Sequence, residues 1–122
     1  MADEITVTAR LDITNGYMKR SFAPGALKFD QTSIGSNWFT WSVGFAAEED
    51  LTLTDITTEG WCVMRNTDTA NYVTYGPKSG TMVAWGRIEA GEVAMCRLEP
   101  GITIRAQANT AAVDLDILIL ED

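Results

Sequence analysis

The amino-acid sequence predicts an all-β protein, folded as an antiparallel β-sandwich with a jelly-roll-like arrangement of about nine short strands. Apolar and polar residues alternate within short segments, which is the periodicity of a strand with one buried face. Turn-forming dipeptides such as Asn15-Gly16 and Pro100-Gly101 separate these segments at short intervals. No segment carries the sustained 3.6-residue periodicity of a long helix.

The size and composition of the chain are those of one globular domain. A chain of 122 residues buries roughly two-thirds of the surface that its unfolded form exposes, which is enough for a core without disulfides. The hydrophobic content of 46% and the charged content of 21% are ordinary for a folded soluble protein. We therefore expect a single sandwich domain over residues 1–122.

The first strand is expected from Ile5 to Ile13, because apolar and polar residues alternate strictly there. Its odd-numbered residues would face the core and its even-numbered residues the solvent. Asn15-Gly16 is expected to form a type I′ turn, since both residues tolerate a positive φ. Tyr17 to Phe22 would return alongside the first strand, and Pro24-Gly25 would form the next turn.

An aromatic strand is expected next, from Asn37 to Ala46, after a short strand at Leu27 to Gln31. Burial of a large apolar side chain contributes about 1.5–3 kcal/mol, so one face of the aromatic strand is predicted to form the centre of the core. The residues of that face are Phe39, Trp41, Val43 and Phe45.

The rest of the chain is expected to form strands separated by turns. Leu51 to Thr58 is the exception, because its apolar spacing fits either a short strand or one helical turn. The expected strands are Trp61 to Arg65, Tyr72 to Tyr75, Thr81 to Ile88, Glu92 to Leu98, Ile102 to Ala106 and Val113 to Glu121.

The net charge and the first residues of the chain indicate which partners and which cellular compartment to expect. The net charge of −8 disfavours binding to a phosphate backbone, so no nucleic-acid partner is expected. No membrane association is expected either, because the longest strongly apolar run, Ile117 to Leu120, is too short to span a bilayer. The acidic start lacks the features of a signal peptide. Cys62 and Cys96 are therefore expected to be reduced, buried and small hydrophobic residues in a cytoplasm.

Enzyme chemistry is not expected. The chain has no His, which removes the usual general base near neutral pH and a common zinc ligand. Paired carboxylates could still act in glycoside hydrolysis or bind Ca²⁺. However, acids in a loop or on the solvent face of a strand are commonly just solvated, so we expect no catalytic residue, metal or cofactor. The acids considered are Glu48, Glu49, Asp50, Asp114 and Asp116.

Aromatic side chains offer a second kind of candidate site, a groove in which sugars stack. In a small sandwich such residues are more often packed in the core or at its rim. The candidates are Trp38, Trp61, Tyr72, Tyr75 and Trp85.

The last expected strand, Val113 to Glu121, is apolar on both faces near its end. Leu118 and Leu120 lie opposite the face that Ile117 and Ile119 commit to the core. An outer face of this kind needs a cover, provided either by the Leu51 to Thr58 segment or by another subunit. Leu118 and Leu120 are accordingly the predicted subunit or capsid interface residues.

The order of turns and strands resembles the small β-rich structural proteins of tailed bacteriophages, over almost the whole chain. The similarity consists of turn and strand residues, and it brings no catalytic motif with it. It is carried by Ile5-Thr6-Val7-Thr8-Ala9, Thr14-Asn15-Gly16, the run from Asn66 to Val73, Ala90-Gly91-Glu92-Val93, Pro100-Gly101-Ile102-Thr103 and the run from Gln107 to Leu115.

The resemblance implies a virion structural protein, most like a capsid decoration (cement) protein that docks on the head shell and stabilises it. It further implies a small homo-oligomer, a dimer or trimer, bound to the major capsid protein or another virion protein. The protein would be made in the host cytoplasm and located on the capsid surface of the virion. Two alternatives stay open: a neck or tail component, and a sandwich that binds carbohydrate or a host receptor. The position in the virion, the oligomeric state and the capsid-binding surface are likewise open, as is a bound glycan or Ca²⁺.

Overall fold

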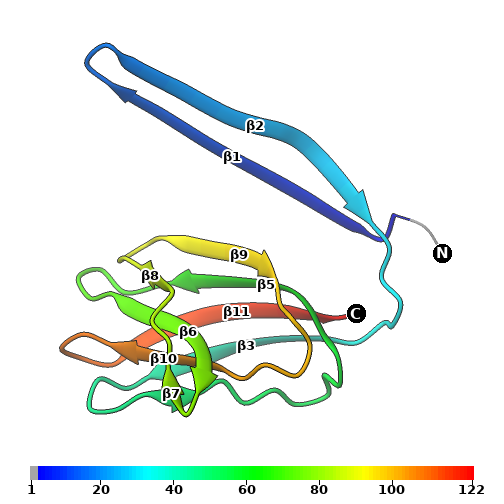
Figure 1. The fold of residues 1–122 in the computed structure, drawn as a ribbon, viewed down its shortest axis with the longest axis vertical. Helices are drawn as coiled ribbons and strands as arrows, with labels where there is room; N and C mark the ends of the chain where they lie inside the picture. The colour runs from blue at the N-terminus through cyan, green and yellow to red at the C-terminus, as the bar shows by residue number, and fades with distance from the viewer. Residues whose placement is uncertain (1–2) are drawn as a thin grey trace. The chain divides into compact units, whose positions relative to one another are not determined.

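The structure is a computed structural model that describes residues 3–122. These residues form eleven β-strands and contain no helix. The chain divides into two compact units, residues 1–32 and residues 33–122, which are described one after the other (Figure 1).

The first unit is an antiparallel hairpin of β1 (Ile5–Asn15) and β2 (Met18–Phe29). Its loop consists of Gly16 and Tyr17, because Asn15 remains paired with Met18. Of the two loop residues only Gly16 has a positive φ, of 58°. A glycine with positive φ at the first central position is the mark of a type II′ turn. The predicted type I′ turn centred on Asn15-Gly16 is therefore wrong by one residue.

The expected turn at Pro24-Gly25 is a β-bulge within a continuous strand. Ala9 pairs with Gly25 and Leu11 with Phe22, so β2 carries one more residue than β1 between these pairs. A bulge tolerates proline, which has no N–H to donate, and the φ of 85° at Gly25 suits glycine. Consequently, the separate strand expected from Leu27 is the second half of β2.

The second unit consists of two antiparallel sheets. The four-stranded sheet has the order β3-β11-β5-β9, and the other has the order β4-β10-β6-β7, with β8 also paired to β6. The first sheet comprises β3 (Ser36–Val43), β5 (Glu59–Asn66), β9 (Val93–Arg97) and β11 (Val113–Glu121). The second comprises β4 (Glu49–Asp50), β6 (Val73–Ser79), β7 (Thr81–Met82), β8 (Gly86–Ile88) and β10 (Ile104–Ala108).

The hydrophobic core of this unit draws on both sheets, as expected for a sandwich. Met64 and Ile117 come from one sheet, and Val73, Ile88 and Ala106 from the other. The predicted all-β, antiparallel fold class is confirmed, whereas a jelly roll is not established by this strand order. The sandwich lies within residues 33–122, and the hairpin strands pair only with each other.

The centre of the four-stranded sheet is β11, which pairs with β3 on one side and β5 on the other. Its inward residues Leu115, Ile117 and Ile119 have no exposed surface. The aromatic strand β3 lies at the sheet's edge, so the prediction that it forms the centre of the core is wrong. Its side chains do pack against the core, except that Phe45 lies beyond its end and is 51% exposed.

The ambiguous segment, residues 51–58, forms neither strand nor helix. Leu51 is buried, and Leu53 and Ile56 pack against the core. The segment is attached to the C-terminal end of the chain by two hydrogen bonds. The Thr57 amide donates to the Glu121 carboxylate at 2.6 Å, and the Asp122 amide donates to the Thr58 carbonyl at 2.9 Å. The apolar side chains of the segment therefore complete the inside of the sandwich.

The strand expected from Thr81 to Ile88 is divided into β7 and β8, both paired with β6. The chain between them approaches β6 so closely that a Cβ at Gly76 would overlap the carbonyl oxygen of Val83. The Val83 amide donates to the Pro77 carbonyl at 2.8 Å, and the Trp85 amide to the Tyr75 carbonyl at 2.9 Å. Only glycine at position 76 permits this approach.

Asn66, at the end of β5, is the only polar side chain that is fully buried among the described residues. Its amide nitrogen donates to the carbonyl oxygens of Asn71 at 2.9 Å and Ile88 at 3.0 Å. Its side-chain oxygen accepts the Asp68 amide at 2.8 Å. A buried amide with partners on both atoms costs little to bury, and here it holds one loop against β8.

The two aromatic residues of the β3 face should differ in their contribution to stability. Truncation of Trp41, which packs against the core, should lower the free energy of unfolding by about 3 kcal/mol. Phe45→Ala removes a half-exposed ring and should cost less than about 1 kcal/mol. Urea denaturation followed by circular dichroism measures both values. Equal losses would contradict the placement of Phe45 outside the core.

Asn66→Ala should destabilise the protein by about 3 kcal/mol, because the buried Ile88 carbonyl oxygen, the partly buried Asn71 carbonyl oxygen and the Asp68 amide lose their partner. Asn37→Ala is the matched control. The Asn37 side chain donates to the backbone and hydroxyl oxygens of Thr54 at an exposed site, and its loss should cost about 1 kcal/mol or less. A similar small loss for both variants would show that water replaces the partners of Asn66.

Candidate interaction surfaces

The outer face of the four-stranded sheet carries an apolar row that crosses all four strands. The register places Trp38 of β3 opposite Leu118 of β11, Leu118 opposite Val63 of β5, and Val63 opposite Met95 of β9. Residues directly opposite in antiparallel strands project from the same face. Because Ile117 and Ile119 face the core, these four side chains form the outer row on the opposite face.

The outer row is not covered by the other strands of its own unit. Trp38 is 72% exposed and Met95 is 38% exposed, while Leu118 and Val63 in the middle are half-buried. The indole of Trp38 is oriented by its Nε1–H, which donates to the Asp116 carboxylate at 2.9 Å. This bond holds a large apolar ring in one place on the sheet face.

The second predicted interface residue, Leu120, lies on the same outer face and is half-buried. Trp61 and Arg97 are paired across β5 and β9 nearby on that face, with the guanidinium 5.6 Å from the ring centroid. Arg97 also contacts the Asp122 carboxylate at 3.2 Å. A polar rim beside an apolar row is the usual composition of a protein–protein contact.

Cover of Leu118 and Leu120 by residues 51–58 was one of the two predicted arrangements. The apolar side chains of that segment pack against the core instead, on the inner side of the sheet. The other predicted arrangement is contact with a further subunit. Sequence reasoning missed Val63 and Met95. The signal for Val63 was present, because Cys62, Val63 and Met64 make β5 apolar on both faces, as in β11.

The hairpin carries a second organised apolar surface, here called the hairpin face. Cross-strand pairs such as Val7–Leu27 and Leu11–Phe22 share this face. Leu11 is 73% exposed and Phe22 is 71% exposed. The sequence predicted that this side of the first strand is buried, which is wrong for Leu11 and for Ile13, at 43% exposure.

The opposite face of the hairpin is polar. Asp12 contacts Arg10 on its own strand at 2.5 Å, and the Ser21 hydroxyl donates to Asp12 at 2.5 Å. The pKa of Asp12 is lowered by the Ser21 hydroxyl first and by Arg10 second. The hairpin is therefore amphipathic, with one face suited to water and the other to an apolar contact.

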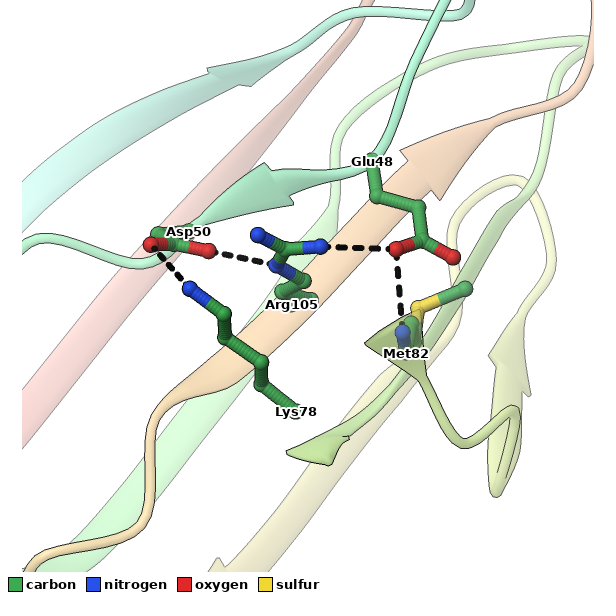
Figure 2. Close-up of polar contacts among 5 residues, drawn as sticks. All are labelled: Glu48, Asp50, Lys78, Met82 and Arg105. Atoms are coloured by element: carbon green, nitrogen blue, oxygen red, sulfur yellow. Dashed lines mark hydrogen bonds and ion pairs between the residues drawn. The ribbon is translucent and has the colours of Figure 1, made fainter. Parts of the chain in front are cut away.

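Two of the acids predicted as candidates for catalysis or Ca²⁺ binding, Glu48 and Asp50, are held in a charged cluster with Arg105 (Figure 2). The Arg105 guanidinium contacts Glu48 at 2.9 Å and Asp50 at 2.5 Å. Lys78 contacts the other oxygen of Asp50 at 3.4 Å, and the Met82 amide donates to Glu48 at 2.9 Å. The cluster joins the loop before β4 to strands β10, β6 and β7.

Both acids of the cluster are stabilised in the ionised form. The pKa of Glu48 is lowered chiefly by the Met82 amide, with a further contribution from Arg105. The pKa of Asp50 is lowered chiefly by its hydrogen bond to Arg105. A general acid near neutral pH needs a raised pKa, whereas the pKa values of these two carboxylates are lowered. Their geometry assigns them to a cross-strand contact.

The remaining acid candidates lie apart from this cluster. Glu49 accepts the Gly44 amide, and Asp116 accepts the Trp38 indole. Asp114 is exposed, on the outer face of β11. Within residues 3–122, no group of three or more His, Cys, Asp or Glu side chains is placed to hold a metal ion.

The five aromatic candidates are distributed over separate places. Trp38 and Trp61 lie on the outer face of the sheet. Tyr72 stacks under the Arg87 guanidinium, 3.9 Å from the ring centroid. Tyr75 and Trp85 line an apolar cavity of about 90 Å³ on the inner side. The sequence did not indicate this division, because strand pairing decides it.

The two cysteines are both free thiols. Cys62 is buried, as predicted, but Cys96 is exposed on the edge strand β9, so the prediction of burial is wrong for it. Both residues line the 90 Å³ cavity.

Comparison with known proteins found no match to this chain among family models, curated proteins or solved structures. Residues 3–122 contain no helix that is long and apolar enough to cross a membrane.

Arg105→Met should destabilise the protein in a pH-dependent way. The ordinary pKa values of Glu48 and Asp50 are 4.5 and 3.8, and both are lowered in the folded protein. The cluster's stabilisation is therefore complete above about pH 5 and is lost as the pH falls through the lowered values. The difference in unfolding free energy between wild type and variant should shrink between about pH 5 and pH 2.

Arg20→Met is the matched control for this measurement, because it removes the same charge. Its guanidinium donates to the Lys19 carbonyl oxygen. Chemical denaturation over the pH series measures both variants. An identical pH dependence for the two would show that the effect reports net charge rather than the cluster.

Proposed function

We propose that the protein is a structural component of a tailed-bacteriophage virion, acting as a capsid decoration (cement) protein that docks on the head shell. The observation that carries the proposal is the presence of two organised apolar surfaces, the hairpin face and the outer row. Each lies on paired strands, and each exposes large side chains within its own unit. The resemblance to small β-rich phage structural proteins indicates that the assembly to which these surfaces bind is a virion.

The hairpin face favours a protein partner. A two-stranded hairpin is marginally stable in water by itself, and it gains stability when its apolar face is covered. Contiguous exposed apolar surface of this kind marks sites of association. Large exposed apolar side chains such as Leu11 and Phe22 call for an apolar surface on the partner, which a protein can offer.

The two surfaces suit two different contacts. The hairpin face is assigned to the major capsid protein or another virion protein. The outer row is assigned to contact between copies, in a dimer or trimer. In a dimer's isologous contact, like patches meet, and Trp38, Leu118, Val63 and Met95 carry no charges that would repel each other.

Docking of this kind stabilises a shell by mass action. A protein that binds the assembled shell, and not its separated subunits, shifts the equilibrium toward the shell. The task requires no catalytic group; it requires a fold that is stable before it binds. The buried core and the satisfied side chain of Asn66 suit that requirement.

A sandwich that binds carbohydrate or a host receptor is the second candidate. The observation in its favour is the exposure of two indole rings, Trp85 at 82% and Trp38 at 72%. Exposed aromatic rings can stack on sugars. Binding to a glycan array, with no affinity for shells, would favour this function. A neck or tail component would use the same surfaces and bind connector or tail complexes instead.

Co-sedimentation with assembled heads tests the proposed function. The gene is co-expressed with the major capsid gene of the same genome, and shells are sedimented. Wild type should sediment with the shells, and Leu11→Ser combined with Phe22→Ser should stay in the supernatant while remaining folded. Thr8→Ser on the polar side of the hairpin is the matched control and should bind as wild type. Wild type that binds tails, or no virion fraction, would contradict the decoration role.

Replacement of Leu118 and Leu120 by Ser tests the contact between copies. The double variant should stay folded but lose self-association in sedimentation velocity, because the outer row loses apolar area. Trp38→Ser serves as a second variant, since a side chain that is 72% exposed can be removed with little effect on folding. Unfolding of the leucine variant with unchanged association of Trp38→Ser would place the leucines in this chain's own packing. Normal association of both variants would exclude the outer row as an interface.

A further inference from the structure

Strand pairing brings the two cysteines of the chain together. Cys62 on β5 and Cys96 on β9 are direct partners in the antiparallel register. Both line the same cavity on the inner face of the sheet, with Met64, Tyr75 and Leu98 around them. Two thiols at one register position form a paired site, in which Cys62 also belongs to the hydrophobic core.

The backbone spacing at this position is compatible with a disulfide. The Leu98 amide donates to Gly60, and the Asn66 amide donates to Glu92, both at 2.9 Å, which identifies these as hydrogen-bonded pairs. Alternation along the ladder makes Cys62 and Cys96 a hydrogen-bonded pair as well, with Cα atoms about 5.5 Å apart. Disulfides span Cα distances of about 4.4–6.8 Å.

The side chains must approach slightly for the bond to form. Cβ atoms of directly opposite residues are about 4.5–5.5 Å apart, with hydrogen-bonded pairs toward the upper end of this range, and a disulfide holds them about 3.5–4.5 Å apart. β9 is an edge strand that pairs only with β5 among the described strands, and the cavity of about 90 Å³ gives the sulfurs room. A small inward shift of β9 is therefore feasible, and the resulting strain makes the bond easy to reduce.

We propose that Cys62 and Cys96 form a reversible cross-strand disulfide when the chain meets a disulfide oxidant such as oxidised glutathione. The bond links the edge strand β9 covalently to β5 and so prevents β9 from separating from the sheet. The proposal is independent of the proposed function, since it concerns only the sandwich unit and its own thiols.

The reaction begins at the exposed cysteine. The Cys96 thiolate attacks one sulfur of oxidised glutathione, giving a mixed disulfide and releasing one glutathione thiolate. The Cys62 thiolate then attacks the Cys96 sulfur, which forms the internal disulfide and expels the second glutathione. The two cysteine protons end on the two glutathione molecules, and two electrons pass from the protein to the oxidant. Burial raises the pKa of both thiols, and it raises that of Cys62 to about 12, so the attack by Cys62 is the slow step.

Thiol counting on the full chain tests this order of events. The native protein is incubated with oxidised glutathione, quenched with acid, denatured and titrated. Wild type should fall from two thiols to none, lose two hydrogens in mass, remain unlinked to other chains and recover both thiols with dithiothreitol. Cys62→Ser should stop at one glutathione adduct on Cys96. Cys96→Ser should form no adduct, because Cys62 is buried. Circular dichroism confirms that each variant is folded.

Three results would overturn the proposal. The first is wild type that accumulates a stable glutathione adduct on Cys96 without closing the internal bond. The second is oxidation that yields only disulfides between chains. The third is retention of two thiols in the folded protein under conditions that oxidise the urea-unfolded chain.

Discussion

The sandwich depends on the insertion of its last strand, β11, between β3 and β5. This pairing buries Leu115, Ile117 and Ile119 completely and supplies the middle of the four-stranded sheet. The partners of β11 lie far back in the sequence, so their ladders form only after large loops close. A sheet of this kind is expected to fold slowly, because non-local pairing precedes most of the apolar burial. The contacts of residues 51–58 with Glu121 and Asp122 also depend on β11 being in place.

The register that builds the core also positions the outer row. Successive strand residues project to opposite faces, so burial of Ile117 places Leu118 outside. Pairing then sets Trp38, Val63 and Met95 beside it. A slip of one residue would exchange the core and outer faces, and burial of the core side chains strongly disfavours this exchange. The candidate contact between copies is therefore as precisely positioned as the core itself.

Polar side chains connect neighbouring strands and loops of the structure. Arg105 joins the acids before and within β4 to β10, and Asn66 joins the end of β5 to β8. The Trp38–Asp116 bond orients a surface ring. In each case the hydrogen-bonding capacity of a polar side chain is used within the fold. The accessible features on which the proposals rest are the apolar surfaces of the outer row and the hairpin face, together with the thiol of Cys96.

The sequence by itself determined the strand class, the bounds of β11 and the outward placement of Leu118 and Leu120, because alternation is local and can be read along one strand. Only the tertiary structure decided which strands are neighbours, and hence that β11 and not β3 is central and that Cys62 meets Cys96. It also decided that Pro24-Gly25 is a bulge, since a bulge exists only relative to a partner strand. The exposure of Leu11 follows the same principle. Alternation shows that a residue shares a face with other apolar side chains, but burial requires a second surface, and its presence depends on contacts between residues far apart in the sequence.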